Sequence, residues 1–352
     1  MKNIKTIAIL VLVACFMLAM VACGEKKETA KEAEYKLGMG VVVGTDSSAE
    51  GNAQVDATIA AVVTDKDGKI VSCRIDVAQN KMNVTAGAVE ADKTFKTKME
   101  LGDDYNMAKY GKPNVEGGTV KEWYVQTKAF EEYVVGKTVA QVEAIETKEV
   151  NAHQIPVDEA LLNAGCTMQI TEFKAAVVKA CKDEQGMTFK TSEKFTLGVA
   201  AKTTVDSSTV AATATEAGAA NMYSDMACAV VAGGKVIATL NDAIQPKIAI
   251  NAAGVPTPAE FKGTKRELKE DYNMAKFGAP NVEGGTVLEW YVQSAAFSNY
   301  VLGKTAAEIA GMETKVVNNH HISVDEALLS AGCTMQITGI CAVVAQAANN
   351  AR

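Results

Sequence analysis

The chain has 352 residues, 48% of them apolar, which is enough for two ordinary domains that each bury a core and too apolar for a disordered chain. Its 35 Lys and Arg are outnumbered by 42 Asp and Glu, giving a formal net charge of −7. Because no basic stripe is present to neutralise phosphates, the composition argues against nucleic acid as a partner.

The first predicted element is an export signal. Lys2 and Lys5 precede an apolar run, Ile7 to Ala22, whose 16 residues are too few for a membrane-spanning helix. Cys23 follows this run and precedes a polar stretch. We therefore predict a lipoprotein signal peptide at 1–22, a polar tether at 23–35 and lipid attachment at Cys23. The mature protein is expected to be exported and lipid-anchored to the outer face of the cell membrane.

An internal repeat predicts the domain organisation. A shift of 167 residues superimposes 104–138 on 271–305 with most positions identical, so the chain is a tandem duplication. The first repeat is predicted to span 36–181 and the second 195–352. The segment 182–194, which begins with a polar stretch, is predicted to be the linker between them.

Each repeat is predicted to begin with strands. Segments 55–64 and 70–77 flank a turn in which Gly68 can supply a positive φ, which is typical of a β-hairpin. Segments 226–231 and 236–240, around Gly233 and Gly234, are the second copy of this hairpin.

The later half of each repeat is predicted to be helical. Apolar side chains recur at helical spacing from Val120 to Val134, and Gly136 ends the pattern. Thr138 and Thr305 begin sequences typical of capping boxes, and a last helix is expected with Thr171 as its N-cap. The fold class is therefore α+β: two tandem homologous domains, each an antiparallel β-hairpin or sheet half followed by packed helices.

An aromatic group recurs in both repeats of a chain that has few aromatic residues. It comprises Tyr105, Met107, Tyr110, Trp123 and Tyr124, repeated as Tyr272, Met274, Phe277, Trp290 and Tyr291. One interpretation is a helix stripe that faces the core. The other is a flat apolar wall on which a heteroaromatic ring stacks, where each good contact contributes roughly 0.5–1.5 kcal/mol beyond area burial.

The turn Ala-Gly-Cys-Thr also occurs twice, with Gly165 and Thr167 in the first repeat and Gly332 and Thr334 in the second. Small residues let another protein's active site approach the backbone closely. The free N–H groups of the helix that follows would favour a phosphate esterified to either threonine. The alternative is an ordinary turn feeding a helix. However, Val157–Thr171 differs from its twin at one position of fifteen, whereas the hairpins have diverged heavily.

These features together resemble the extracytosolic FMN-binding domains that carry FMN as a phosphoester on threonine. The chain is most similar to the two-flavin lipoproteins of Gram-positive extracellular electron transfer, of the peptide-pheromone-encoding type. The usual signature is Asp-x-x-Ser/Thr-Gly-Ala-Thr, and the chain departs from it with Ala-Gly-Cys-Thr and with Leu161 and Leu328 at the Asp position.

The resemblance implies sites, a cofactor and partners. Thr167 and Thr334 would be FMN attachment points, and Tyr105, Trp123, Tyr272 and Trp290 would neighbour the flavin ring. An ApbE-type flavin transferase would attach the cofactor. A membrane redox donor and an extracellular electron acceptor would be the partners of a carrier that has no substrate of its own.

Two alternatives remain open. The first is a cofactor-free solute-binding or adhesion lipoprotein, in which the aromatic group is core or ligand cleft. The second is a thiol enzyme that uses Cys166 and Cys333 with His153 and His320. No CxxC, HxxxH or paired-carboxylate spacing accompanies these residues, so the sequence predicts no metal site.

Overall fold

The computed structural model describes residues 31–90, 93–258 and 260–352. The predicted signal peptide, Cys23 and the tether up to residue 30 lie outside the described residues. Among the helices of the described part, none has the length and hydropathy needed to cross a bilayer.

The first sheet is an antiparallel meander. Its central strands are β1 (Ala33–Gly44), β2 (Asn52–Asp65) and β3 (Ile70–Thr85), with β4 (Ala88–Val89) beside β3 and β7 (Met187–Thr191) beside β1. The turn between β2 and β3 holds Gly68 at φ 73°. The Asp65 carboxylate accepts hydrogen bonds from the backbone N–H groups of Asp67 and Lys69. The predicted hairpin is thereby confirmed.

The second sheet repeats the antiparallel meander. It contains β8 (Thr196–Val205), β9 (Gly218–Ala232), β10 (Lys235–Ile244), β11 (Lys247–Ile250) and β12 (Pro256–Thr257). One end of β9 pairs with both β8 and β10, and its other end pairs with β11. The Gly233-Gly234 turn, with both φ values positive, connects β9 to β10 as the sequence predicts.

Short helices and small hairpins follow each sheet. In the first repeat these are α2 (Lys98–Leu101), η1 (Gly102–Tyr105), α3 (Met107–Tyr110), α4 (Trp123–Val134), α5 (Val139–Glu143), β5 (Thr147–Val150), β6 (His153–Pro156), α6 (Glu159–Ala164) and α7 (Thr171–Cys181). In the second they are α8 (Lys265–Leu268), η2 (Lys269–Tyr272), α9 (Met274–Phe277), α10 (Trp290–Tyr300), α11 (Ala306–Ala310), β13 (Thr314–Val317), β14 (His320–Ser323), α12 (Glu326–Ser330) and α13 (Thr338–Asn349). Both predicted capping boxes are present, at Thr138 and Thr305.

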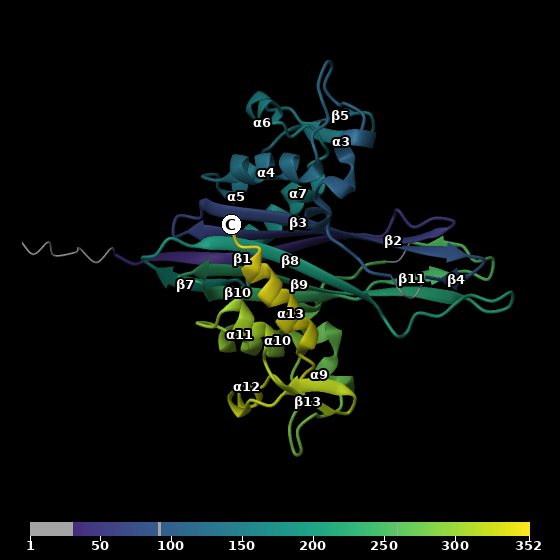
Figure 1. Ribbon diagram of the computed structural model, residues 1–352, viewed down its shortest axis with the longest axis vertical. Coiled ribbons are helices and arrows are strands. Elements are labelled where there is room, and N and C mark those ends of the chain that lie inside the picture. Colours follow the sequence, from purple (N-terminus) through teal and green to yellow (C-terminus); the bar gives the residue numbers. More distant parts are fainter. Residues whose placement is uncertain (1–30, 91–92, 259) are drawn as a thin grey trace, which may run out of the picture. The chain divides into compact units, whose positions relative to one another are not determined.

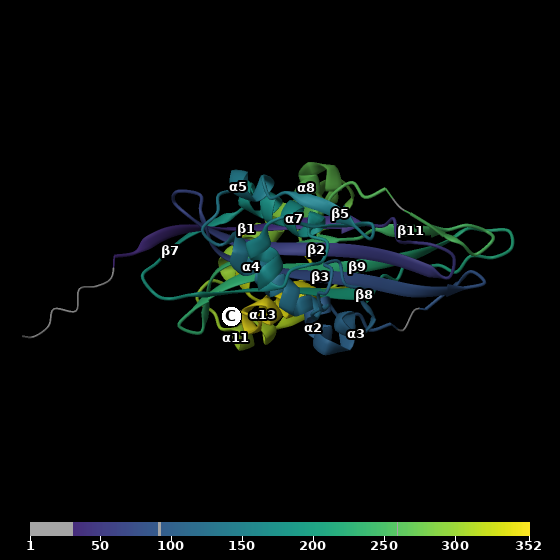
Figure 2. The same ribbon diagram turned by 90° about the horizontal axis from the view of Figure 1, so that it is seen from above.

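The two sheets face each other and share one core. Leu37, Ile59 and Val63 of the first sheet cluster with Met226 and Val230 of the second, all fully buried. The helices of each repeat cover the outer face of their own sheet and bury a separate cluster there. Residues Ala33–Arg352 thus form one compact unit in four layers, helix, sheet, sheet and helix (Figures 1 and 2). The α+β class is confirmed, but the core between the sheets belongs to both repeats.

Three sequence expectations differ from the structure. Segment 182–194, predicted to be a linker, contains β7, which adds to the first sheet by pairing Met187–Thr191 with β1. The predicted tether ends early, since Ala33 already pairs with Thr191. Thr171 is not the N-cap of α7 but its first helical residue. Ile170 precedes it and is held in place because its N–H donates to the Gln154 carbonyl.

Glycine in β1 lets α7 lie directly on the first sheet. An ideal Cβ on Gly40 would stand 2.1 Å from the Ala176 carbonyl oxygen, a backbone atom that cannot rotate away. We therefore expect Gly40→Ala to lower the free energy of unfolding by about 1–3 kcal/mol through overpacking. The matched control is Gly44→Ala at the end of the same strand, where a Cβ meets nothing within 4 Å. Urea unfolding measures both, and equal stabilities would contradict this packing.

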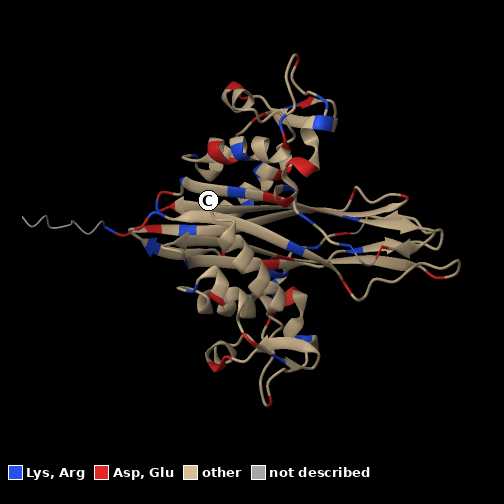
Figure 3. Ribbon diagram, in the orientation of Figure 1, with Lys and Arg blue, Asp and Glu red and all other residues tan. Residues whose placement is uncertain are grey.

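Charged residues of both signs are interspersed along the described chain. Figure 3 shows Lys and Arg lying among Asp and Glu on both helical layers and on the exposed strand ends. The shared core holds a large apolar cluster, and one buried hydrogen bond, from Asn80 Nδ2 to Ser224 Oγ at 3.3 Å, joins strands of the two sheets.

Candidate functional site

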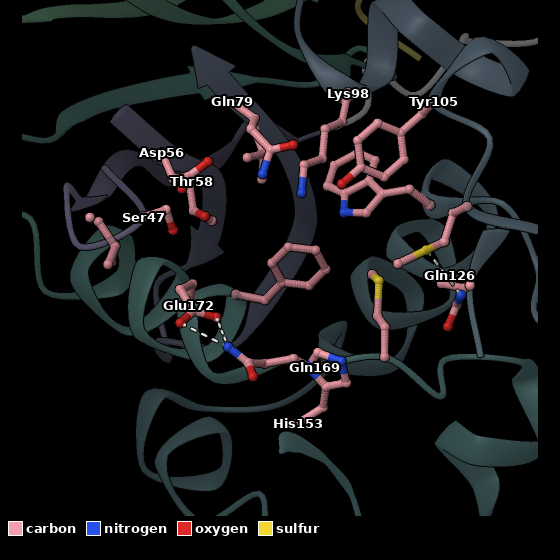
Figure 4. Close-up of a pocket in the computed structure, with 18 of the residues that line it drawn as sticks. Ser47, Asp56, Thr58, Gln79, Lys98, Tyr105, Gln126, His153, Gln169 and Glu172 are labelled. Carbon is pink, nitrogen blue, oxygen red and sulfur yellow. Dashed lines mark hydrogen bonds between the residues drawn. The ribbon is translucent and has the colours of Figure 1, made fainter. Parts of the chain in front are cut away.

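A cavity of about 740 Å³ opens between the outer face of the first sheet and the helical layer of the first repeat. Strands β1, β2 and β3 contribute one wall, including Asp56, Thr58 and Gln79. Segments from the helical layer contribute the other, including Lys98, Tyr105 and Thr167. Figure 4 shows Lys98 and Tyr105 on one side of the space and Gln169 and Glu172 on the other. The volume falls in the range typical of small-molecule and cofactor sites, roughly 300–1,000 Å³.

Thr167 is held at the cavity wall by two side chains from other segments. The Gln126 Oε1 atom accepts hydrogen bonds from the Thr167 backbone N–H at 2.9 Å and from its hydroxyl at 3.3 Å. Asn114 Nδ2 donates to the Thr167 carbonyl at 3.0 Å. Gln126 is itself fixed because its Nε2 donates to the Lys121 carbonyl at 2.8 Å. The hydroxyl is thus presented in a defined place.

The backbone of the turn before Thr167 requires a glycine at position 165. Helix α6 ends at Gly165, whose φ of 104° L-residues rarely adopt. A Cβ there would also stand 2.2 Å from Lys121 Nζ, so this ammonium lies directly beside the turn. Gly165 therefore serves the backbone geometry of the turn and the close approach of a cation.

The aromatic group divides between cavity and surface. Tyr105, Met107 and Trp123 line the cavity, although Trp123 is only 2% exposed and packs edge-on against Phe173 at 5.8 Å between centroids. Tyr110, by contrast, is 73% exposed on the surface. Trp123 thus belongs to the buried cluster under the helices, whereas Tyr105 lies at the cavity wall with Lys98 over its ring.

Lys98 is a charged group that sequence reasoning missed. Its Nζ lies 4.8 Å from the Tyr105 ring centroid and 5.8 Å from that of Trp123, and it makes no hydrogen bond to any residue that the structure describes. The sequence carried a signal, since Thr97 and Glu100 form a capping box at the start of α2. Gln126 and Asn114 could also have been found, because both lie in the nearly identical stretch of the repeats.

Buried Asp76 fixes the element that carries Lys98. Its carboxylate accepts from the Met99 N–H at 3.1 Å and is 2% exposed, and burial raises its pKa to about 7. The folded state therefore binds this proton more tightly than the unfolded chain, whose Asp pKa is about 3.9. The resulting stabilisation is complete below that lower value and is lost as pH rises through 7.

We expect Asp76→Asn to reduce the loss of stability between pH 5 and pH 7.5, because asparagine keeps an acceptor and has no proton to release. Urea unfolding at the two pH values measures the difference. Exposed Asp104→Asn is the control and is expected to leave the pH dependence as in the parent chain. An unchanged pH dependence in the Asp76 variant would show that this carboxyl does not titrate in the range.

The cysteine of each turn lies in an environment that disfavours a thiolate. Cys166 and Cys333 are fully buried, and burial raises the pKa of each thiol to about 12. Because the thiolate is the nucleophilic form, this burial argues against the thiol-enzyme alternative. His153 lines the cavity as an exposed residue. Within the described ranges, no cluster of His, Cys, Asp and Glu is arranged to hold a metal ion.

The hydrogen bonds that hold Thr167 are repeated around Thr334 in the second half. Gln293 accepts from the Thr334 N–H at 2.9 Å, and Asn281 donates to the Thr334 carbonyl at 3.0 Å. Gly332 has a φ of 97°, as Gly165 has a positive φ in the first turn. Tyr272 and Trp290 lie around Lys265 as Tyr105 and Trp123 lie around Lys98.

Comparison with known proteins finds a similarity over part of the chain. No protein-family model matches the chain, and no solved structure matches it. Over 116 residues the chain is 34% identical to a chlorophenol reductase of Desulfitobacterium hafniense. The match covers 29% of this chain and 34% of that protein, so the chain spans about a third of the length of the curated relative. A match of this extent assigns no family.

Proposed function

We propose that the protein is an exported, lipid-anchored flavoprotein that carries FMN covalently on a threonine of its Ala-Gly-Cys-Thr turn and relays electrons in extracellular electron transfer. The observation that carries the proposal is the position of the Thr167 hydroxyl. It lies at the wall of a cavity of about 740 Å³ and is held by the buried Gln126. A clamped hydroxyl beside a cofactor-sized space is the arrangement that a phosphoester-linked ligand needs.

The residues around the cavity fit the chemistry of FMN. Tyr105 and Trp123 line the cavity and offer apolar area to a flat ring, and Lys98 places a positive charge at that end of the cavity. Lys112 lines the cavity and Lys121 lies beside the turn, so both can compensate the negative charge of a phosphodiester on Thr167. When bound, FMN supplies one- and two-electron transfer.

The donor of the FMN group in the attachment step is flavin adenine dinucleotide. Thr167 Oγ1 forms a bond to the phosphorus on the riboflavin side, and the bond from that phosphorus to the bridging oxygen breaks. AMP leaves with the electron pair, and the hydroxyl proton passes to a base of the flavin transferase. A covalent bond suits an exported carrier because it prevents loss of the cofactor by dissociation into the medium.

The test uses the chain from Gly24 onward, which lacks the predicted signal peptide and the lipid-bearing Cys23, co-expressed with an ApbE-type flavin transferase. After denaturation and washing, we expect a yellow protein whose intact mass exceeds the chain by FMN less water. Thr167→Ala is expected to remove that added mass at the first site. A colourless protein of unmodified mass, from cells in which the same transferase labels a control substrate, would favour the cofactor-free solute-binding lipoprotein instead.

A further inference from the structure

The two repeats present their threonines alike but differ in the space next to them. Strand registers define the matching positions, since Leu37 pairs with Val63 in the first sheet and Leu197 pairs with Val230 in the second. A residue of β2 therefore corresponds to the residue of β9 that lies 167 positions later. By this rule, two cavity-lining residues, Asp56 and Thr58, correspond to Tyr223 and Asp225.

Tyr223 lies where the first repeat is open. Lys265 Nζ donates to the Tyr223 hydroxyl at 3.1 Å and lies 4.5 Å from the centroid of its ring. Its counterpart Lys98 is partly exposed in the cavity, whereas Lys265 is 6% exposed. Burial lowers the pKa of Lys265 to about 8, which agrees with the loss of contact with water. The tyrosine of the second repeat thus covers the lysine that would face a flavin ring.

A second side chain fills the opposite part of the same space. Glu172, which lines the cavity of the first repeat, corresponds to Gly339. Asp225 Oδ2 lies 2.0 Å from the position that a Cβ on Gly339 would take, so the aspartate reaches from β9 to the helix α13. Burial raises the pKa of Asp225 to about 6. A carboxylate therefore extends into the second site where the first repeat carries the small Thr58.

The cations near the threonine are also missing from the second repeat. Lys112 corresponds to Ala279, and Lys121 corresponds to Leu288. Leu288 Cδ1 stands 2.6 Å from an ideal Cβ on Gly332, in the place that Lys121 Nζ takes beside Gly165. A phosphodiester on Thr334 would lie next to a leucine methyl group instead of an ammonium group, which would leave its charge uncompensated.

We propose that Tyr223 and Asp225 close the second site, so that Thr167 alone takes the flavin and the chain carries one FMN despite its two identical Ala-Gly-Cys-Thr turns. This inference rests on the proposed function for the identity of the ligand. The closure itself is a property of the chain's own side chains. The second repeat then serves as a structural partner that supplies half of the shared core.

The first experiment counts flavins by intact mass in the denatured mature chain after co-expression with the transferase. We expect one FMN in the parent chain and in Thr334→Ala, and none in Thr167→Ala. Two FMN groups in the parent chain, or one that remains in Thr167→Ala, would overturn the proposal. Circular dichroism of the threonine variants confirms that each is folded.

A gain-of-function variant tests whether these side chains cause the difference between the two sites. Converting the second site to the first type, with Tyr223→Asp, Asp225→Thr, Ala279→Lys and Leu288→Lys in a Thr167→Ala background, is expected to place an FMN on Thr334. If this variant is folded and carries no FMN, the four side chains do not account for the difference, and the proposed cause is wrong.

Lysine labelling tests the closure of the second site without any flavin, and therefore independently of the proposed function. With no transferase present, brief reductive methylation followed by peptide mapping is expected to modify Lys98 and to leave Lys265 protected, and Tyr223→Asp is expected to expose Lys265. If no flavin is found on the parent chain while a control substrate is labelled, the proposed function fails and the flavin assignment fails with it. Protection of Lys265 alone would then still support the closed site, and equal labelling of both lysines would overturn it.

Discussion

Replacing Arg266 by methionine is expected to lower the free energy of unfolding by about 3–5 kcal/mol, because it leaves the buried Asp183 carboxylate without its cation. The Arg266 and Asp183 side chains are 7% and 8% exposed, and their closest contact is 3.1 Å. Arg266 also donates to the Gln185 carbonyl at 3.0 Å. This ion pair joins the segment after α7 to the start of α8, and so it connects the two repeats.

The two repeats provide the substitutions for this test. Methionine, as Met99, occupies the first-repeat position that matches Arg266, and Asn350 occupies the second-repeat position that matches Asp183. Urea unfolding of Arg266→Met, Asp183→Asn and the double variant should show a smaller loss in the double variant than the sum of the singles. Lys190→Met, in the exposed pair with Glu34, is the control and should cost about 0–1 kcal/mol. An Arg266 variant as stable as this control would contradict the coupling.

Replacing Gln126 by leucine is expected to have the largest effect on flavin attachment short of removing Thr167. The change leaves the Thr167 N–H without its acceptor and frees the hydroxyl, and an unpaired buried donor costs about 1–3 kcal/mol of stability. Because the transferase then meets a mispositioned nucleophile, we expect the initial rate of FMN incorporation to fall roughly ten- to a hundredfold.

The control is Gln293→Leu, which breaks the same contacts to Thr334 in the second repeat. It is expected to lower stability by a similar amount and to leave FMN incorporation unchanged. Equal rates in the two leucine variants would show that Gln126 contributes only to folding and does not position Thr167.

The elements and their repetition could be predicted because they depend on local interactions. The hairpin around Gly68 follows from a turn residue with positive φ between two β-rich segments, and the capping boxes at Thr138 and Thr305 each involve four consecutive residues. The turn that presents Thr167 was found for the same reason, since a glycine with a φ of 104° is a local requirement of the backbone. Its partners were missed, because Gln126 lies 41 residues away and only packing brings it to Thr167.

The sequence by itself determined that this chain is a duplicated α+β protein with two matched threonine turns, since these features depend on turn, cap and repeat patterns that neighbouring residues carry. Only the tertiary structure decided that the two sheets share a core and that segment 187–191 is a strand, because both depend on contacts between distant segments. It likewise decided that Tyr223 covers Lys265 while Lys98 faces an open cavity. The strand register sets which side chains face the helical layer, and so it decides which strand residues reach the site.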